Sequence, residues 1–344
     1  MPADPIDSQS HARGALLGLA VGDALGTTLE FSVPPPLPFP SLATGPHADL
    51  TGGGPFGLAP GQVTDDTQLA ACLALSIRER GGFDVGDVAR RYQGWRAEAF
   101  DVGTLTGAAL DQLDQGASPT ESGLLAWRRR PPRPAGNGSL MRTTPIGVAF
   151  AGDPLARRAA ALRESAVTHY DPRCQLACAA FDAAIGAAVS RRAGTREAVL
   201  QAAREELVPA AAALAGAPGL SLAEVREAVG ALAVDLSLAG QDDPLLYGPE
   251  LHLHEQQGYV RVAFRLAFWE LLHAPDLRSG LVDVVNRGGD ADTNAAIAGA
   301  LLGAFHGEQA IPRRWVAQVL EALHDRPGPL RDLYHPRRLL ELVA

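Results

Sequence analysis

Residues 286–294 read NRGGDADTN, and an apolar run rich in alanine and glycine continues to residue 305. The Gly-Gly pair favours a tight turn, and the acids and threonine after it are typical of a helix start. The pattern therefore predicts carboxylates and a hydroxyl at the N-terminus of a buried helix. Residues 61–67, GQVTDDT, show the same pattern upstream and precede a second apolar run at residues 69–77. The interpretation of the chain depends on whether these two acidic turns face each other.

The composition favours helices. Of the 344 residues, 47% are hydrophobic, enough for a substantial core, while only 6% are aromatic and β-branched runs are scarce. No segment shows sustained alternation of apolar and polar residues, and no repeat of solenoid length or break in composition divides the chain. We therefore predict an all-α fold, with a polar tail at residues 1–13 and one compact domain at residues 14–344.

Charge, cysteine content and hydropathy argue against several classes of protein. The formal net charge of −9 argues against general nucleic-acid binding. The cysteines, Cys72, Cys174 and Cys178, are odd in number and form no CxxC pair, so no disulfide framework is expected. The N-terminus does not resemble a signal peptide, and the apolar stretches are too short or too interrupted to span a membrane. These features predict a cytoplasmic protein that does not enter a membrane.

Two single acids are weaker candidates for catalysis. Residues 14–26, GALLGLAVGDALG, repeat glycine every four residues, which predicts a helix packed very closely against another helix. Glu30 follows between Leu29 and Phe31, a poor place for a simple solvated carboxylate. Asp101 stands where a helical pattern breaks and is most simply a turn or capping acid.

The acids of the two turns together suggest a metal site. Either turn alone is most simply a helix cap, but one capping oxygen suffices for a helix start, and four crowded carboxylates would repel one another unless cations neutralise them. Oxygen ligands favour two hard ions, Mg²⁺ or Mn²⁺, rather than zinc. The predicted ligands are Thr64, Asp65, Asp66, Asp290, Asp292 and Thr293.

Other segments carry weaker signals. Residues 34–61 are rich in proline and glycine and predict a long loop ahead of the first acidic turn. Residues 136–142, GNGSLMR, offer successive backbone N–H groups that suit a diphosphate, although an ordinary turn is the simpler interpretation. His169 is most simply structural, and the pair His252 and His254 lacks a third metal ligand nearby. Residues 330–343 predict a terminal helix.

These motifs together resemble a known family. GLAVGDALGTTLEF (18–31), PGQVTDDT (60–67), GNGSLMR (136–142), THYDP (168–172) and VNRGGDADTN (285–294) occur in the order found in the ADP-ribosylglycohydrolase family. The chain is most similar to the bacterial branch typified by dinitrogenase reductase-activating glycohydrolase. Thr104 and Tyr170 depart from the nitrogenase-linked pattern beside the expected substrate site.

The resemblance implies an orthogonal multi-helix fold with a binuclear Mg²⁺ or Mn²⁺ centre held by the six ligands given above. It implies that Glu30 lies on the loop covering the metals and that Asp101 lies beside the scissile bond, as candidate general acid or base. It further implies substrate contacts to the diphosphate, the ribose-phosphate portion and the adenine, made in that order by Gly136, Asn137, Gly138 and Ser139, by His169 and by Tyr259.

The expected function is metal-dependent hydrolysis of the bond between ADP-ribose and a protein side chain, most simply arginine, with ADP-ribose as product. We expect a monomer whose partner is the ADP-ribosylated protein. Three alternatives stay open: a hydrolase of ADP-ribosyl-serine, nucleic-acid or free ADP-ribose-metabolite substrates; a non-catalytic ADP-ribose binder or immunity protein; and a metal-dependent phosphohydrolase.

Overall fold

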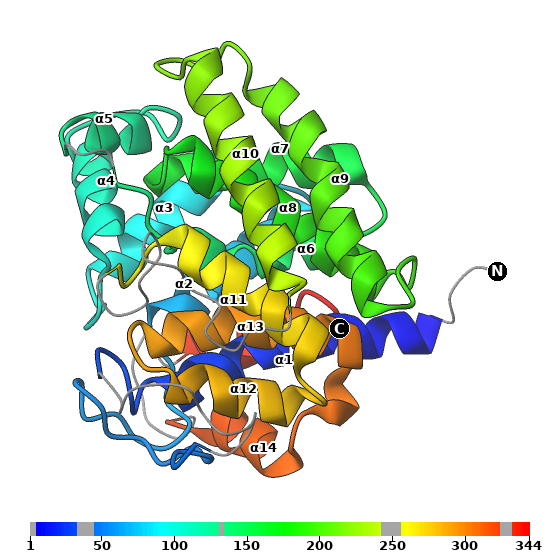
Figure 1. The fold of residues 1–344 in the computed structure, drawn as a ribbon. Helices are drawn as coiled ribbons and strands as arrows, with labels where there is room; N and C mark the ends of the chain where they lie inside the picture. The colour runs from blue at the N-terminus through cyan, green and yellow to red at the C-terminus, as the bar shows by residue number, and fades with distance from the viewer. Residues whose placement is uncertain (1–4, 33–44, 131–133, 242–255, 324–331) are drawn as a thin grey trace.

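The computed structural model describes residues 5–32, 45–130, 134–241, 256–323 and 332–344, in which helices joined by loops make up the fold (Figure 1). The only β pairing among the described residues is two isolated bridges, Gly53 with Leu58 and Gly136 with Tyr259. The α-helices are α1 (Pro5–Gly26), α2 (Asp65–Arg80), α3 (Val85–Arg96), α4 (Thr104–Asp114), α5 (Ser122–Arg128), α6 (Thr144–Ala149), α7 (Pro154–Thr168), α8 (Pro172–Val189), α9 (Arg196–Leu214), α10 (Leu222–Ala239), α11 (Val260–His273), α12 (Leu277–Asn286), α13 (Ala291–His306), α14 (Arg313–Glu321) and α16 (Arg337–Leu340). Short 3₁₀ helices occupy η1 (Leu140–Arg142) and η2 (Glu308–Ala310).

Helices α1 and α13 form the centre of the molecule and run antiparallel. The glycine stripe of α1 lies directly on the backbone of α13: a Cβ added at Gly18 would lie 2.1 Å from the carbonyl oxygen of Gly299, and one at Gly22 would lie 2.0 Å from that of Ala295. Only glycine permits so close an approach. The expected close helix contact is therefore confirmed, and it brings the C-terminal end of α1 to the acidic N-terminus of α13.

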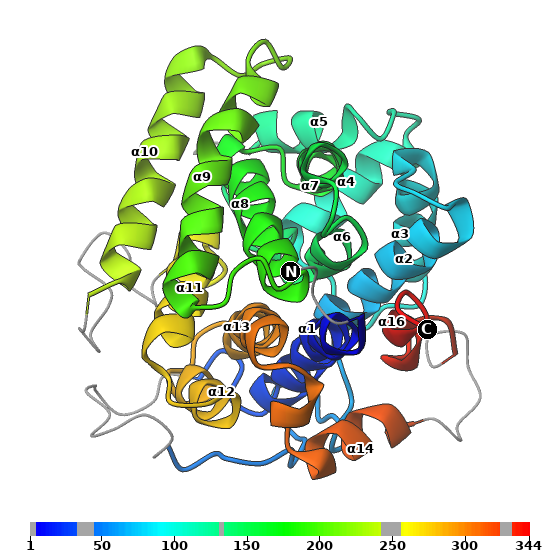
Figure 2. The ribbon, with the colours of Figure 1, turned by 90° about the vertical axis from the view of Figure 1, so that its right-hand side faces the viewer.

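The other helices cover this central pair. In both ribbon views α8, α9 and α10 lie on one side of α1 and α13, while α12 and α14 lie on the other (Figure 2). Helix α8 is buried along almost its whole length, and the buried apolar side chains form one main cluster that includes residues of α1, α2, α8, α11 and α13. The all-α fold predicted from composition is confirmed.

Several boundaries differ from the predictions. Helix α1 begins at Pro5 rather than near residue 14, and Ala12 is buried, so the segment predicted as a polar tail is largely helical. The helix predicted over residues 330–343 is wrong as a continuous element, because bends at Tyr334 and His335 and a turn at Pro336 interrupt it before α16. Residues 34–44 of the predicted loop, and His252 with His254, lie outside the described residues.

The cysteines and the hydropathy of the helices bear on two further predictions. All three cysteines are buried and free. No helix in the described part of the chain combines the length and the apolar character needed to cross a lipid bilayer.

Alanine at Gly18 should destabilise the protein, because its methyl group would meet the carbonyl of Gly299 and push α1 from α13. We expect a loss of about 1–3 kcal/mol in the free energy of unfolding, typical of overpacking. Gly230→Ala is the matched control: Gly230 lies inside α10 with open space around it, so alanine there should stabilise by about 0.5–1 kcal/mol. Chemical denaturation measures both changes, and equal effects at the two positions would contradict the close contact.

Candidate metal centre

The two acidic turns meet in one cavity of about 310 Å³. Helix N-termini and the loops before them supply most of its walls. Of the residues predicted to form the site, the cavity is lined by Glu30, Asp65, Asp101, Gly136, Asn137, Gly138, His169, Asp290, Asp292 and Thr293. Thr64, Asp66, Ser139 and Tyr259 do not line it.

Helix α2 presents the first acidic turn. Thr64 is the N-cap residue and is fully buried, yet its side chain makes no capping bond to its own helix. Its hydroxyl instead lies 2.9 Å from Asp23 Oδ1, 3.1 Å from Asp66 Oδ2 and 3.5 Å from Asp292 Oδ2. The hydroxyl has one proton, and the shortest contact assigns it to Asp23, which leaves the oxygen lone pairs facing the acids of the site.

Asp23 on α1 is a functional residue that the sequence analysis missed. Its carboxylate accepts hydrogen bonds from the backbone N–H groups of Thr64 and Thr67 and from both of their hydroxyls. Asp23 therefore caps α2 from another helix, and its oxygens are fully used by these donors. The available signal was the position of an acid inside an apolar, glycine-striped helix.

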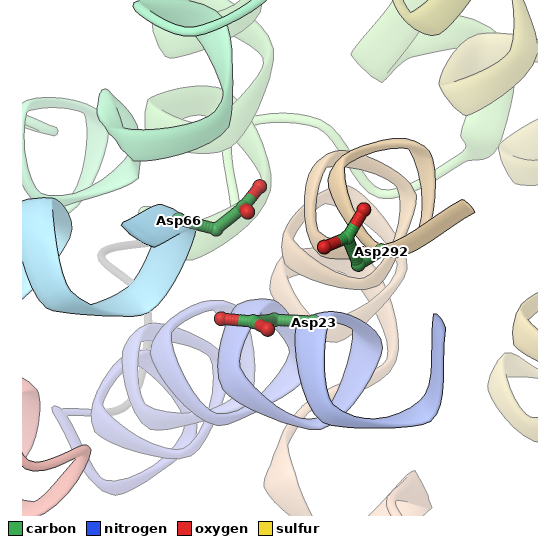
Figure 3. Close-up of side chains that lie close together, drawn as sticks. All are labelled: Asp23, Asp66 and Asp292. Carbon is green, nitrogen blue, oxygen red and sulfur yellow. The ribbon is translucent and has the colours of Figure 1, made fainter. Parts of the chain in front are cut away.

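Three acids from three helices converge at this point. Asp23 of α1, Asp66 of α2 and Asp292 of α13 point toward a common space (Figure 3), and one oxygen of each lies within 4.8 Å of the others. Asp66 Oδ1 is buried without a hydrogen-bond partner. Because Asp23 is occupied by N–H and O–H donors, Asp66 and Asp292 are the members of this group with oxygens available for a cation.

The second acidic turn depends on Gly288 and Gly289, which both adopt the left-handed backbone conformation, with φ of 71° and 68°. Two backbone hydrogen bonds join the turn to the segment after α1. Phe31 N–H donates to the Gly289 carbonyl, and Gly289 N–H donates to the Ser32 carbonyl. These bonds bring Glu30 to the start of α13. Glu30, Asp290 and Asp292 each place one oxygen within 4.8 Å of the others.

Burial makes the crowded carboxylates hard to ionise without cations. Desolvation, followed by repulsion from neighbouring acids, raises the pKa of Asp65, Asp66 and Asp292 well above the usual range. The same causes raise the pKa of Glu30 to about 8. Glu30 Oε2, like Asp66 Oδ1, is buried without a partner. Unsatisfied carboxylate oxygens and adjacent hydroxyls are the donors that hard divalent cations prefer, so the residues present fit a metal centre.

Asp101 stands against Asp65. It precedes α4, lines the cavity and lies within hydrogen-bonding reach of the Asp65 side chain. Burial is the main cause that raises the pKa of Asp101. Glu30 and Asp101 thus approach the same cavity from different loops.

The glycine-containing turn forms another part of the cavity wall, with one unexpected role. Asn137, predicted to contact substrate, donates its side-chain N–H to Asp290 Oδ2 at 2.7 Å and so orients a predicted metal ligand. Ser139 is fully buried, and its hydroxyl accepts from Ser165 behind the turn. Tyr259 precedes α11, and its hydroxyl accepts from Arg173 rather than facing the cavity.

The fold and the site define a class: an all-helical protein whose cavity gathers acids at helix N-termini in a form suited to divalent cations. Comparison with known proteins identifies the family. The model of the ADP-ribosylglycohydrolase family matches residues 4–342, and the chain belongs to this family.

Relatives cover most of the chain. It is 29% identical to the ADP-ribosyl-[dinitrogen reductase] glycohydrolase of Rhodospirillum rubrum over 90% of both chains. It is 30% identical to the ADP-ribosylarginine hydrolase Tri1 of Pseudomonas putida, over 93% of this chain and 77% of that protein. A solved structure titled ADP-ribosylglycohydrolase-related protein complex superposes with a TM-score of 0.71 at 32% identity, covering 98% of each chain. Such proteins hydrolyse glycosidic bonds to ADP-ribose, and this chain is an enzyme of that class.

Replacing Asp23 by asparagine should weaken metal binding without removing a ligand. The amide would offer one acceptor in place of two and would turn an N–H group toward the donors of Thr64 and Thr67. Positioning residues of this kind typically affect metal affinity by about 10–100-fold. Mn²⁺ titration followed by electron paramagnetic resonance should show reduced affinity but unchanged stoichiometry.

Two further variants serve as comparisons for the Asp23→Asn titration. Asp66→Asn should lower the stoichiometry, and Asp111→Asn, at an exposed acid of α4, should change neither quantity. Wild-type Mn²⁺ affinity in a folded Asp23→Asn protein would show that the cap from α1 is dispensable.

The stability of the metal-free protein should fall as pH rises. The folded-state pKa of Glu30 is about 8 against an ordinary 4.5, so its neutral form is favoured by folding. This contribution to the free energy of unfolding is fully present below the pKa of Glu30 in the unfolded chain. It is lost as the pH rises through the pKa of Glu30 in the folded protein. Thermal unfolding in EDTA should therefore show Tm decreasing between about pH 5 and pH 8, and Mg²⁺ should reduce the decrease. A Tm that rises across this range in EDTA would show that folding does not favour the neutral form of these carboxyls.

Proposed function

We propose that this protein hydrolyses the glycosidic bond between ADP-ribose and an arginine side chain of a modified protein, releasing ADP-ribose. The names of the relatives support this substrate class, since two of the similar proteins are called ADP-ribosylarginine hydrolases. We further infer that it acts as a cytoplasmic monomer. Its buried, unpaired cysteines are compatible with a reducing compartment.

The charge of the cavity is the observation that supports arginine. Five carboxylates line it and Asp66 lies directly behind, while no lysine or arginine is among its described lining residues. Two divalent cations would bring four positive charges to these six acids and the adjoining Asp23, so 4 − 7 leaves three negative charges. A guanidinium acceptor complements this excess, whereas a serine acceptor is neutral.

We propose two Mg²⁺ or Mn²⁺ ions as cofactors. The residues that would hold them are Thr64, Asp65, Asp66, Asp290, Asp292 and Thr293, and Glu30 lies close enough to Asp290 and Asp292 to join them. When bound, the ions supply positive charge that orients the ribose hydroxyls and balances the acids.

The chain's own carboxylates would manage the proton. In the hydrolysis the C1″–N bond breaks with its electron pair going to the guanidine, and a water oxygen bonds to C1″. The water loses a proton and the released guanidine regains one, which requires a carboxylate near both. Asp101 and Glu30 both line the cavity, and either could carry this proton.

The glycine turn would hold the other end of the substrate. Gly136 and Gly138 line the cavity next to His169, and the absence of side chains on these glycines exposes backbone N–H groups to a diphosphate. His169, packed on both glycines, would contact the ribose-phosphate portion.

Product analysis with defined substrates tests this function. ADP-ribosyl-arginine and ADP-ribosyl-serine peptides are incubated with the enzyme, with and without Mg²⁺. We expect intact ADP-ribose from the arginine peptide only when the ion is present. Preference for the serine peptide would refute the charge argument, and release of AMP or phosphate would indicate a phosphohydrolase.

Two variants test the proton-transfer assignment on the same substrate. Asp101→Asn or Glu30→Gln should lower the rate of hydrolysis by about 10²–10⁴-fold, the usual contribution of general acid–base catalysis. The exposed Asp111→Asn variant again serves as the control and should keep the wild-type rate. If both cavity variants hydrolyse the arginine peptide normally, neither carboxylate has the proposed role.

A further inference from the structure

A buried arginine behind the cavity has no role in the site described so far. Arg142 is the last residue of the GNGSLMR motif, lies in η1 and is fully buried. Its Nε donates to Glu164 Oε1 at 2.7 Å, and one terminal nitrogen donates to Thr168 Oγ1 at 2.7 Å. Tyr92 O–H also donates to Glu164 Oε1, and the guanidinium lies 4.6 Å from the centre of the Tyr92 ring. Arg142 is therefore fixed in orientation.

The hydrogen bond from Arg142 to Thr168 also determines the direction of the hydrogen bond between Thr168 and His169. A guanidinium can only donate, so Thr168 Oγ1 accepts from Arg142. The Thr168 hydroxyl proton remains, and His169 Nδ1 lies 2.7 Å from the same oxygen. Among the described residues, Thr168 Oγ1 has no other hydrogen-bond partner, and its side chain is buried.

The two possible tautomers of His169 are thus unequal. If Nδ1 carried the proton and donated to Thr168, the threonine hydroxyl would have two donors directed at it and no acceptor for its own proton. A buried hydroxyl proton without an acceptor is unfavourable. If Nδ1 is unprotonated, it accepts from Thr168, and the threonine hydroxyl is then satisfied both as acceptor and as donor. The ring proton then lies on Nε2.

Nε2 faces the glycine turn. A Cβ added at Gly138 would lie 3.0 Å from His169 Nε2, and one added at Gly136 would lie 3.2 Å from it. His169 lines the cavity with both glycines. Burial, followed by the charge of Arg142, lowers the pKa of His169 to about 3, so the ring is neutral at physiological pH.

We propose that Arg142, acting through Thr168, sets the tautomer of His169 so that Nε2–H is a fixed hydrogen-bond donor to an anionic oxygen of the ligand. The role rests on the proposed function, in which that oxygen belongs to the diphosphate of ADP-ribose. Arg142 and Thr168 are positioning residues, since neither lines the cavity. The protein thus directs the proton of a neutral ring at the ligand, and no cationic side chain is found among the described residues of the cavity wall.

The tautomer itself can be measured. Nitrogen-15 NMR of histidine-labelled protein distinguishes protonated from unprotonated ring nitrogens, and a His169→Gln sample identifies the signals of this residue. We expect a protonated Nε2 and an unprotonated Nδ1 in the wild-type enzyme. A protonated Nδ1 would overturn the proposal. In Thr168→Val the preference for Nε2–H should be lost, while Thr168→Ser, which keeps the hydroxyl, should retain it.

Ligand binding provides the second readout. Calorimetric titration of the Mg²⁺-loaded enzyme with ADP-ribose should show the Kd rising about tenfold in Thr168→Val, as expected for one impaired hydrogen bond, and staying close to wild type in Thr168→Ser. Thr144→Val is a matched control, because the Thr144 hydroxyl is buried without a hydrogen-bond partner. An equal loss of affinity in Thr144→Val and Thr168→Val would show that the effect comes from altered packing and not from the Thr168 hydroxyl.

The two proposals fail in different ways. If the wild-type enzyme does not bind ADP-ribose, the proposed function is wrong, while the NMR signals still report the tautomer. If wild type binds and Thr168→Val binds equally well with its tautomer unchanged, the positioning role is wrong and the function stands. If Thr168→Val does not fold, the wild-type spectrum alone decides whether Nε2 carries the proton.

Discussion

The direct contact between the backbones of α1 and α13 is the constraint on which the site depends. Gly18 and Gly22 allow the two helices to approach until backbone meets backbone, which fixes both their separation and their register. Because the helices are antiparallel, this register places the end of α1 at the beginning of α13. Asp23 then reaches the start of α2, and Glu30 reaches Asp290 and Asp292. A shift along this contact would separate acids that come from opposite ends of the chain.

A second principle of the site is the assignment of hydroxyl protons by groups behind the cavity. Thr64 has three carboxylates around its hydroxyl, and the shortest contact gives the proton to Asp23, leaving lone pairs toward the acids. Thr168 accepts a hydrogen bond from Arg142 and must donate its own to His169. In both cases a fully buried charged side chain acts only as a hydrogen-bond donor or only as an acceptor. It thereby determines whether a neutral group directs a proton or a lone pair at the cavity.

The sequence was sufficient to predict the site residues that share a motif, but not the residues that hold them in position. The surplus of acids in residues 64–66 and 290–292 predicted that the two turns meet, since the excess has no use at an isolated cap. Asp23 was missed because its partners lie more than forty residues away, and a buried acid on an apolar helix gives no sign of what it caps. Asn137 was predicted to face substrate because its glycine neighbours suggest an anion cradle, whereas its amide is used by Asp290. The start of α1 was misplaced because a polar composition does not prevent a helix whose inner face is buried.

The chemical division of the cavity constrains how a substrate can enter it. Acids occupy the part near the starts of α2 and α13, while glycine backbone and a neutral histidine occupy the part around residues 136–138. Under the proposed function, a diphosphate would lie in the glycine part, where oriented N–H dipoles attract it. A ribose joined to that diphosphate must then extend toward the acids, where bound cations can hold its hydroxyls. The group beyond the ribose would lie near Glu30 and Asp101, whose negative charge favours a cationic acceptor. The proposed function therefore gives the substrate one direction in the cavity, which the distribution of charge favours before any side chain specific to the modified protein is considered.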